Sequence, residues 1–276
     1  MDKVILLNKN GKIVLVISII ISILSAYSAI RGFVDENLYG DIIATGVFKP
    51  VYMAGTISQD MITIVSSVIM IFLVMFYVKR KSTKMFITIL GLLSFYFYAY
   101  GTYVISTLYT QIYFIYMIIF TLSLFGLIIG INGFKKEDIN KTFLPKKMQI
   151  LSIIFLSVIV VLFVPMWVSA MIPYIQSNNV PDFYAIFILD LCFVMPFFVV
   201  LIYMIFKNHK LSNILLGIAL TKNITLIISV IIGELTFPTH GGIIDIGVVL
   251  IYSFIILISS LIFIFYCLKL NIVNEK

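Results

Sequence analysis

Residues 183–206 read FYAIFILDLCFVMPFFVVLIYMIF and contain a single charged side chain, Asp190. An apolar run of about 20 residues is long enough to cross the hydrocarbon core of a bilayer as an α-helix. The run is continuous, whereas a membrane β-strand alternates apolar and polar residues. The stretch therefore predicts a membrane-spanning helix that carries one charge inside it.

The rest of the chain has the same character. It is 62% hydrophobic and 11% charged, whereas soluble domains carry about 25% charged residues. We predict an all-α fold, a polytopic transmembrane helix bundle that forms a single domain of residues 1–276. The eight predicted spans are residues 13–32, 61–78, 85–105, 110–133, 148–172, 183–206, 211–233 and 246–268.

The basic residues predict the orientation. Sixteen of the 19 Lys and Arg residues lie before the first span or in the segments after the second, fourth, sixth and eighth spans. The opposite side holds only Arg31 and Lys49. Cytoplasmic segments carry the excess of basic residues, so both termini are predicted to be cytoplasmic in a multi-pass cell-membrane protein. The positive charge then suits anionic lipid headgroups, and we expect no binding to nucleic acid.

The first span has a second interpretation. Lys3, Lys9 and Lys12 precede an apolar run and the small-residue segment Ala26-Tyr27-Ser28-Ala29, a pattern typical of a signal peptide. The apolar run is longer than a usual signal core, so we favour an uncleaved helix. Cleavage would leave seven spans and an N-terminus outside the cell.

A parallel four-plus-four repeat is a further possibility, with halves 1–134 and 148–276. Each half has an acidic residue in its second span and a basic turn after it, and Gly91 aligns with Gly217. Some transporters are built from parallel repeats of this kind.

Asp190 and Lys222 are the most informative residues, because ionisable side chains inside a span usually face the bundle interior and have a partner. A short turn joins their spans, which predicts antiparallel neighbours. At 1.5 Å per residue, the two lie about 6 Å apart in depth. The pair either lines a substrate or ion path or locks two helices together, and unpaired snorkelling toward an interface is the third possibility.

Other polar side chains share helix faces with this pair or lie nearby. Lys222, Thr225 and Ser229 follow the spacing i, i+3 and i+7 on one face of the seventh span. Tyr96 and Tyr100 repeat at i and i+4 on the third span. The tyrosines form either a hydroxyl-bearing wall for an amphipathic ligand or an interfacial belt with ordinary packing.

Motifs for enzymes and cofactors are missing from the sequence. It contains no His-Glu-x-x-His, no Gly-x-Ser-x-Gly, no phosphate-binding glycine loop and no dinucleotide fingerprint. Glu234, His240 and Asp245 are metal-binding residue types in one loop, but their spacing fits no known motif. We therefore predict no catalytic residue, no metal and no cofactor, and leave open whether the protein is an enzyme, favouring that it is not.

Four local features carry a resemblance to known sequences. They are Gln59-Asp60 opening a helix that ends in a basic turn, the Tyr-rich run Tyr98–Tyr116 before Ser123-Leu124-Phe125, Ile188-Leu189-Asp190 before Pro196, and Leu220-Thr221-Lys222 after a basic turn. From Asp60 to about Glu234 the chain resembles a family of uncharacterised polytopic membrane proteins of bacteria and archaea. The resemblance implies an eight-span architecture and draws attention to Asp60, Asp190 and Lys222, and it implies no particular activity.

Together these features predict membrane-embedded binding or transport of a small polar or amphipathic molecule or of an ion. One alternative is a non-catalytic membrane partner subunit of a transporter or lipid-processing complex. Another is an intramembrane lipid-modifying enzyme with Asp60 or Asp190 as general base. The candidate substrate or ion site consists of Asp190, Lys222, Thr225, Ser229, Tyr96, Tyr100 and Asp60.

The charge asymmetry gives a testable topology. A reporter active only in the cytoplasm should work at the C-terminus and fail near residue 176. Cysteines introduced at Gly40 and His240 should react from outside intact cells with a membrane-impermeant thiol reagent, and cysteines at Thr83 and Asn140 should not. Labelling at Thr83 in intact cells would contradict the orientation.

Overall fold

A computed structural model of the chain describes residues 9–46, 53–181 and 183–272, and every predicted span within them is helical. Eight helical segments are long and apolar enough to cross a membrane, which confirms the predicted eight-span fold class. These are α1 (Lys9–Val34), α3 (Met53–Arg80), α4 (Thr83–Ile105), α5 (Tyr113–Ile131), α7 (Lys146–Gln176), α8 (Tyr184–Leu189) continued by the π-helical turn η2 (Asp190–Val194) and α9 (Met195–Phe206), α10 (Ser212–Thr236) continued by the 3₁₀ turn η3 (Phe237–His240), and α11 (Ile246–Lys269).

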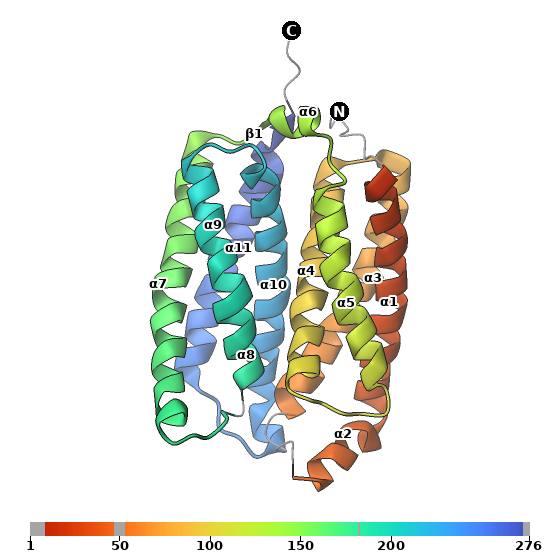
Figure 1. Cartoon of the computed structure of the whole chain (residues 1–276), viewed down its shortest axis with the longest axis vertical. Coiled ribbons are helices and arrows are strands. Elements are labelled where there is room, and N and C mark those ends of the chain that lie inside the picture. The colour runs from red at the N-terminus through yellow and green to blue at the C-terminus, as the bar shows by residue number, and fades with distance from the viewer. Residues whose placement is uncertain (1–8, 47–52, 182, 273–276) are drawn as a thin grey trace.

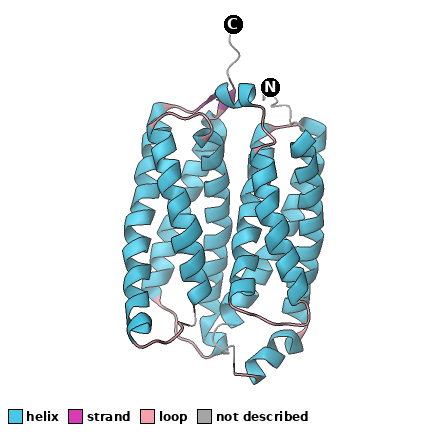
Figure 2. Cartoon of the chain, viewed as in Figure 1, coloured by secondary structure: helices cyan, strands magenta, loops and turns pink. Residues whose placement is uncertain are grey.

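The spans form two groups of four that stand side by side (Figures 1 and 2). In the first bundle α1, α3, α4 and α5 form a ring in which each helix contacts the next. In the second bundle α7, α9, α10 and α11 form a looser ring of the same kind. The boundary between the groups falls where the sequence suggested a four-plus-four division, and an internal repeat stays a prediction.

Short elements mark the two ends of the molecule (Figure 1). At the α6 end, α6 (Lys136–Asn140) precedes β1 (Thr142–Phe143), which pairs antiparallel with β2 (Asn271–Ile272). At the opposite end, called the α2 end, lie α2 (Glu36–Ala44) and η3. The beginning of α1 and the end of α11 both lie at the α6 end, as an even number of spans requires.

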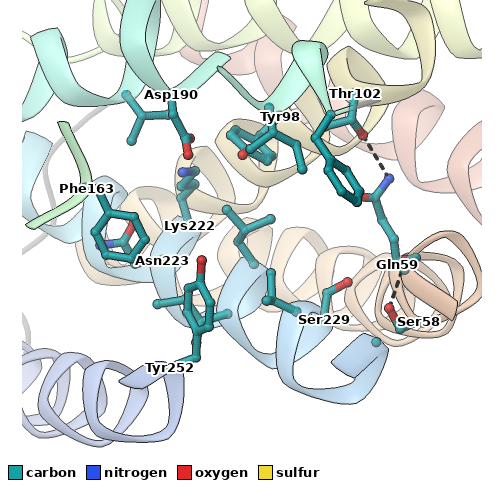
Figure 3. A pocket seen from close by; sticks show the side chains of 18 of the residues that line it. Ser58, Gln59, Tyr98, Thr102, Phe163, Asp190, Lys222, Asn223, Ser229 and Tyr252 are labelled. Atoms are coloured by element: carbon teal, nitrogen blue, oxygen red, sulfur yellow. Dashed lines mark hydrogen bonds between the residues drawn. The ribbon is translucent and has the colours of Figure 1, made fainter. Parts of the chain in front are cut away.

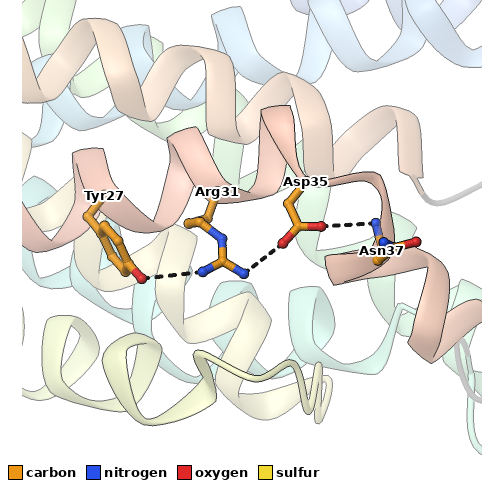
Figure 4. Close-up of polar contacts among 4 residues, drawn as sticks. All are labelled: Tyr27, Arg31, Asp35 and Asn37. Carbon is orange, nitrogen blue, oxygen red and sulfur yellow. Dashed lines mark hydrogen bonds and ion pairs between the residues drawn. The ribbon is translucent and has the colours of Figure 1, made fainter.

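A charged turn fixes α2 against the end of α1 (Figure 4). Arg31 and Asp35 form an ion pair of 2.6 Å, and Arg31 also reaches the Tyr27 hydroxyl at 3.5 Å. Asp35 is the N-cap of α2 and accepts a hydrogen bond from the backbone N–H of Asn37. Such a cap satisfies one of the unpaired N–H groups at a helix start.

The two bundles meet where α10 packs on α4 and α3. Gly91 of α4 lies against the side chain of Thr221, and Gly217 of α10 lies against Ile87 and Tyr266. A Cβ atom at either glycine would overlap those side chains. Small residues let membrane helices approach closely, and this closeness replaces the hydrophobic driving force that lipid cannot supply.

One helix start differs from the prediction. The second span was expected to begin at residue 61, after Asp60, but α3 begins at Met53 and buries Asp60 inside the helix. The additional turns contain small and polar residues that contribute little apolar length. They stay helical because they pack on α10, where Gly233 lies against Ser58 and Gly55.

The glycine contact between α4 and α10 is testable by stability. Gly91→Ala should destabilise the protein by about 1–3 kcal/mol, because the added methyl overlaps Thr221. Gly40→Ala is the matched control: Gly40 lies in α2 with no described atom near its missing Cβ, and alanine favours helix. Thermal unfolding in detergent should rank Gly91→Ala below the native protein and Gly40→Ala at or above it. Equal stability of Gly91→Ala and the native protein would show that this contact is loose.

Candidate functional site

Asp190 occupies an irregular position in its span. It opens the π-helical turn η2, in which the backbone N–H of Met195 donates to the Asp190 carbonyl across a widened loop. Pro196 follows at the start of α9, where its missing N–H costs little. The span thus accommodates the proline with a π turn. Single π turns within α-helices are frequent at functional sites.

The Asp190 carboxyl is held by the only tryptophan of the chain. Trp167 of α7 donates a hydrogen bond from Nε1 to Oδ2 of Asp190 at 2.9 Å. The indole ring itself packs beside Phe163 and Phe187. A buried indole N–H needs an acceptor, so the contact satisfies both groups and orients the carboxyl.

Lys222 lies near the middle of α10 and is buried, with 6% of its surface exposed. Its Nζ lies 4.4 Å from the ring centroid of Tyr98, a cation–π contact from α4. No oxygen of Asp190 lies within the 4.0 Å of an ion pair, although the opposite charges are close enough to attract each other. The predicted charged neighbours are thus together, and Figure 3 shows their head groups pointing toward each other.

Both head groups face a cavity of about 350 Å³ that extends from this level toward the α2 end. Helices α3, α4, α7, α10 and α11 and the segment α8–α9 all contribute to its wall. The wall is mostly apolar with scattered polar groups, as ligand pockets commonly are. Its polar side chains besides Asp190 and Lys222 include Thr56, Ser58, Gln59, Tyr98, Thr102, Tyr103, Asn223, Ser229, Glu234 and Tyr252.

A second space, an apolar groove, adjoins this cavity. It measures about 220 Å³ and is lined by α4, α5, α9, α10 and η2. Tyr98, Val194, Phe198 and Lys222 line both spaces. Lys222 and Tyr98 therefore lie between the partly polar cavity and the apolar groove.

The structure brings together three of the seven predicted site residues. Asp190, Lys222 and Ser229 line the cavity. Thr225 does not, and its hydroxyl donates to the carbonyl of Thr221 on the same helix. Whether the three residues bind a ligand stays a prediction.

The two predicted tyrosines lie inside the first bundle. The Tyr96 hydroxyl is within 3.1 Å of both Ser66 and Ser67. The Tyr100 hydroxyl is hydrogen-bonded to Ser28 and donates to the carbonyl of Ser25. Both rings are almost fully buried, and their hydroxyls are bonded to groups of α1 and α3.

Asp60 lies behind the cavity wall. Its carboxyl oxygens are hydrogen-bonded to the hydroxyls of Tyr39 and Tyr103, and only Tyr103 of these three lines the cavity. Asp60 is 1% exposed.

Sequence reasoning missed Tyr98, Gln59 and Trp167 as cavity residues. Tyr98 is two residues from Tyr96 and therefore lies on a different face of α4, and Tyr98 lines the cavity. Trp167 carried a usable signal, because a lone indole donor inside an apolar span needs an acceptor in a neighbouring span. Helical spacing alone gave no way to find Gln59, which lies before the predicted start of its span.

The polar groups at the end of α10 and in the segment that follows it form local hydrogen bonds. Glu234 lines the cavity, and its Oε1 accepts a hydrogen bond from the backbone N–H of Asp245 at 2.7 Å. The His240 ring bonds Thr239 at 2.8 Å. Within the described part of the chain, no three His, Cys, Asp or Glu side chains gather as a metal site would require.

The eight apolar helices define the class of protein: the chain is a multi-pass membrane protein. No protein-family model, curated protein or solved structure matches it.

The proximity of the two charges is testable by a double-mutant cycle. Removing one of two interacting buried charges leaves the other uncompensated, so Asp190→Asn and Lys222→Met should each lower the unfolding free energy. The double variant should recover part of the loss, with a coupling of about 0.5–3 kcal/mol. The partly exposed pair Arg31 and Asp35 is the control, where a much smaller coupling is expected because solvent screens the two charges. Additive losses at Asp190 and Lys222 would show that the charges do not interact.

Proposed function

We propose that the protein binds a small amphipathic molecule within the membrane and moves it between the bilayer and the space at its α2 end. The observation that carries the proposal is the position of Lys222, whose side chain lines both the partly polar cavity and the adjoining apolar groove. An amphipathic molecule has a polar part and a hydrocarbon part, and these two adjoining spaces match the two parts.

The charges in the cavity favour a polar group of mixed sign. Lys222 attracts an anionic group, and Asp190 attracts a cationic one. Glu234, nearer the α2 end, adds a second acidic group on the same wall. A zwitterionic head group with an amine and a phosphate or carboxylate satisfies these charges without leaving one unpaired.

The groove supports a hydrocarbon tail. Its wall is built from apolar and aromatic side chains, among them Phe97, Leu127 and Phe197. Phe193, which also lines the groove, is 46% exposed, so this space lies at the surface that faces lipid. A tail can therefore stay in an apolar medium while the head group occupies the cavity.

The even number of spans puts both termini on one side of the membrane, and the basic segments support the cytoplasmic side. The α2 end then faces the outside of the cell. On this orientation the cavity opens toward the outer leaflet. The partner-subunit and lipid-modifying alternatives remain as outcomes of the test below.

Trp167 provides a direct test, because it is the only tryptophan and lines the cavity. We expect its fluorescence to change saturably when lysophosphatidylethanolamine is added to the protein in phosphatidylcholine nanodiscs. Ser229→Phe, which fills the cavity, and Lys222→Met, which removes the cation, should each weaken the apparent affinity about tenfold, or about 1.4 kcal/mol.

Ser169→Phe is the matched control, because Ser169 is an exposed residue of α7 that bonds only its own helix among the described residues. Its affinity should equal that of the native protein. Equal affinities for Ser229→Phe, Lys222→Met and Ser169→Phe would refute the proposed site. A native protein that binds no amphiphile would leave the partner-subunit interpretation as the better one, and hydrolysis of the lipid would favour the enzyme.

A further inference from the structure

Besides Asp190, a second acidic side chain is buried inside the spans, and it lies outside the cavity. Asp60, on α3, is 1% exposed. The Tyr39 hydroxyl lies 2.6 Å from Oδ2, and the Tyr103 hydroxyl lies 3.0 Å from Oδ1. The two tyrosines come from α2 and α4, so three elements enclose one carboxyl group.

Asp60 has no cationic partner among the described residues. No nitrogen of a basic side chain lies within 4.0 Å of it, and Arg31 of the adjacent α1 is paired with Asp35 (Figure 4). The other titratable groups around the carboxyl are tyrosine hydroxyls from α2, α4 and α5: Tyr39, Tyr100, Tyr103 and Tyr116. An ionised carboxylate buried without a counter-charge is so costly that such groups are normally neutral.

The hydrogen-bond geometry around Tyr103 also indicates that the Asp60 carboxyl group is neutral. Its hydroxyl oxygen lies 3.0 Å from Asp60 Oδ1 and 3.1 Å from the carbonyl oxygen of Thr56. A tyrosine hydroxyl has one hydrogen, and a carbonyl can only accept. When Tyr103 donates to Thr56, the hydrogen between Tyr103 and Asp60 must belong to Asp60. The protonated carboxyl therefore satisfies both contacts of Tyr103, whereas the ionised form leaves one without a hydrogen.

Tyr103 connects this group to the cavity, because Tyr103 and Thr56 both line the cavity wall. We propose that Asp60 is a proton-binding site, a carboxylic acid with its proton on Oδ1 that exchanges with water in the cavity through the hydroxyl of Tyr103. In the exchange, the Oδ1–H bond of Asp60 breaks as a new O–H bond forms on Tyr103. The original hydroxyl proton of Tyr103 passes to a cavity water, which becomes hydronium and leaves Asp60 as a carboxylate. The proposal does not depend on which molecule the cavity binds.

Infrared spectroscopy tests the protonation directly, because a carboxylic acid has a carbonyl stretch that a carboxylate lacks. Spectra of the purified protein at neutral pH should contain a carboxylic acid band that Asp60→Asn removes. The salt is choline chloride, so that no alkali cation competes with the proton for the Asp60 carboxyl group. Asp35→Asn is the matched control, since Asp35 is ion-paired and should contribute no such band. A spectrum unchanged by Asp60→Asn in this region would overturn the proposal.

Two conservative variants test the proton position and the route, and they serve if Asp60→Asn does not fold. Tyr39→Phe removes the hydrogen bond to Oδ2, so the carbonyl band should move to higher frequency. Tyr103→Phe should keep the acid band but slow its shift on transfer to D₂O by an order of magnitude. An unmoved band in Tyr39→Phe would contradict protonation on Oδ1, and unslowed exchange in Tyr103→Phe would exclude the route through Tyr103.

Discussion

The close contact between α4 and α10 is the interaction on which the rest of the structure depends. These two helices are the most buried spans, and each belongs to a different bundle. Gly91 and Gly217 have no side chains, and a Cβ atom at either position would hold the helices apart. Because Thr221 packs on Gly91, the next residue, Lys222, is brought over the ring of Tyr98 two turns further along α4. The same packing that joins the bundles thus positions the cation of the cavity.

Hydrocarbon offers no hydrogen-bond partner, so every polar group inside the spans must find one within the protein. In the first bundle many of these partners are neutral hydroxyls: Ser25 bonds Ser67 at 2.8 Å, and Ser67 lies 3.1 Å from the hydroxyl of Tyr96. The second bundle instead directs two opposite charges, Asp190 and Lys222, into an open space. A closed network of neutral groups is the solution expected for packing alone, whereas charges left facing a cavity are suited to a ligand.

The sequence predicted the eight spans because length and apolarity alone determine which segments cross a bilayer. The sequence also predicted that Asp190 and Lys222 are close, because a short turn between two spans makes them pack as antiparallel neighbours. It did not predict the early start of α3, whose first turns are stabilised by packing on α10 and not by apolar length. It also selected Tyr96 as a site residue, whereas Tyr98 is the one of the two that lines the cavity. Periodicity tells which residues share a helix face, but only the tertiary arrangement tells what covers that face.

The two acidic groups buried in the spans have different surroundings, which limits the charge that a molecule bound in the cavity can carry. Asp190 lies near the charge of Lys222, while Asp60 on our proposal carries a proton, so the protein interior has no net charge at either place. A charged head group that displaces Lys222 from Asp190 would leave one of them uncompensated in a medium where that is costly. A zwitterionic molecule avoids the penalty by matching both charges. A molecule with net positive charge avoids it if Asp60 releases its proton through Tyr103 as the molecule enters, which would make binding and proton release two parts of one event.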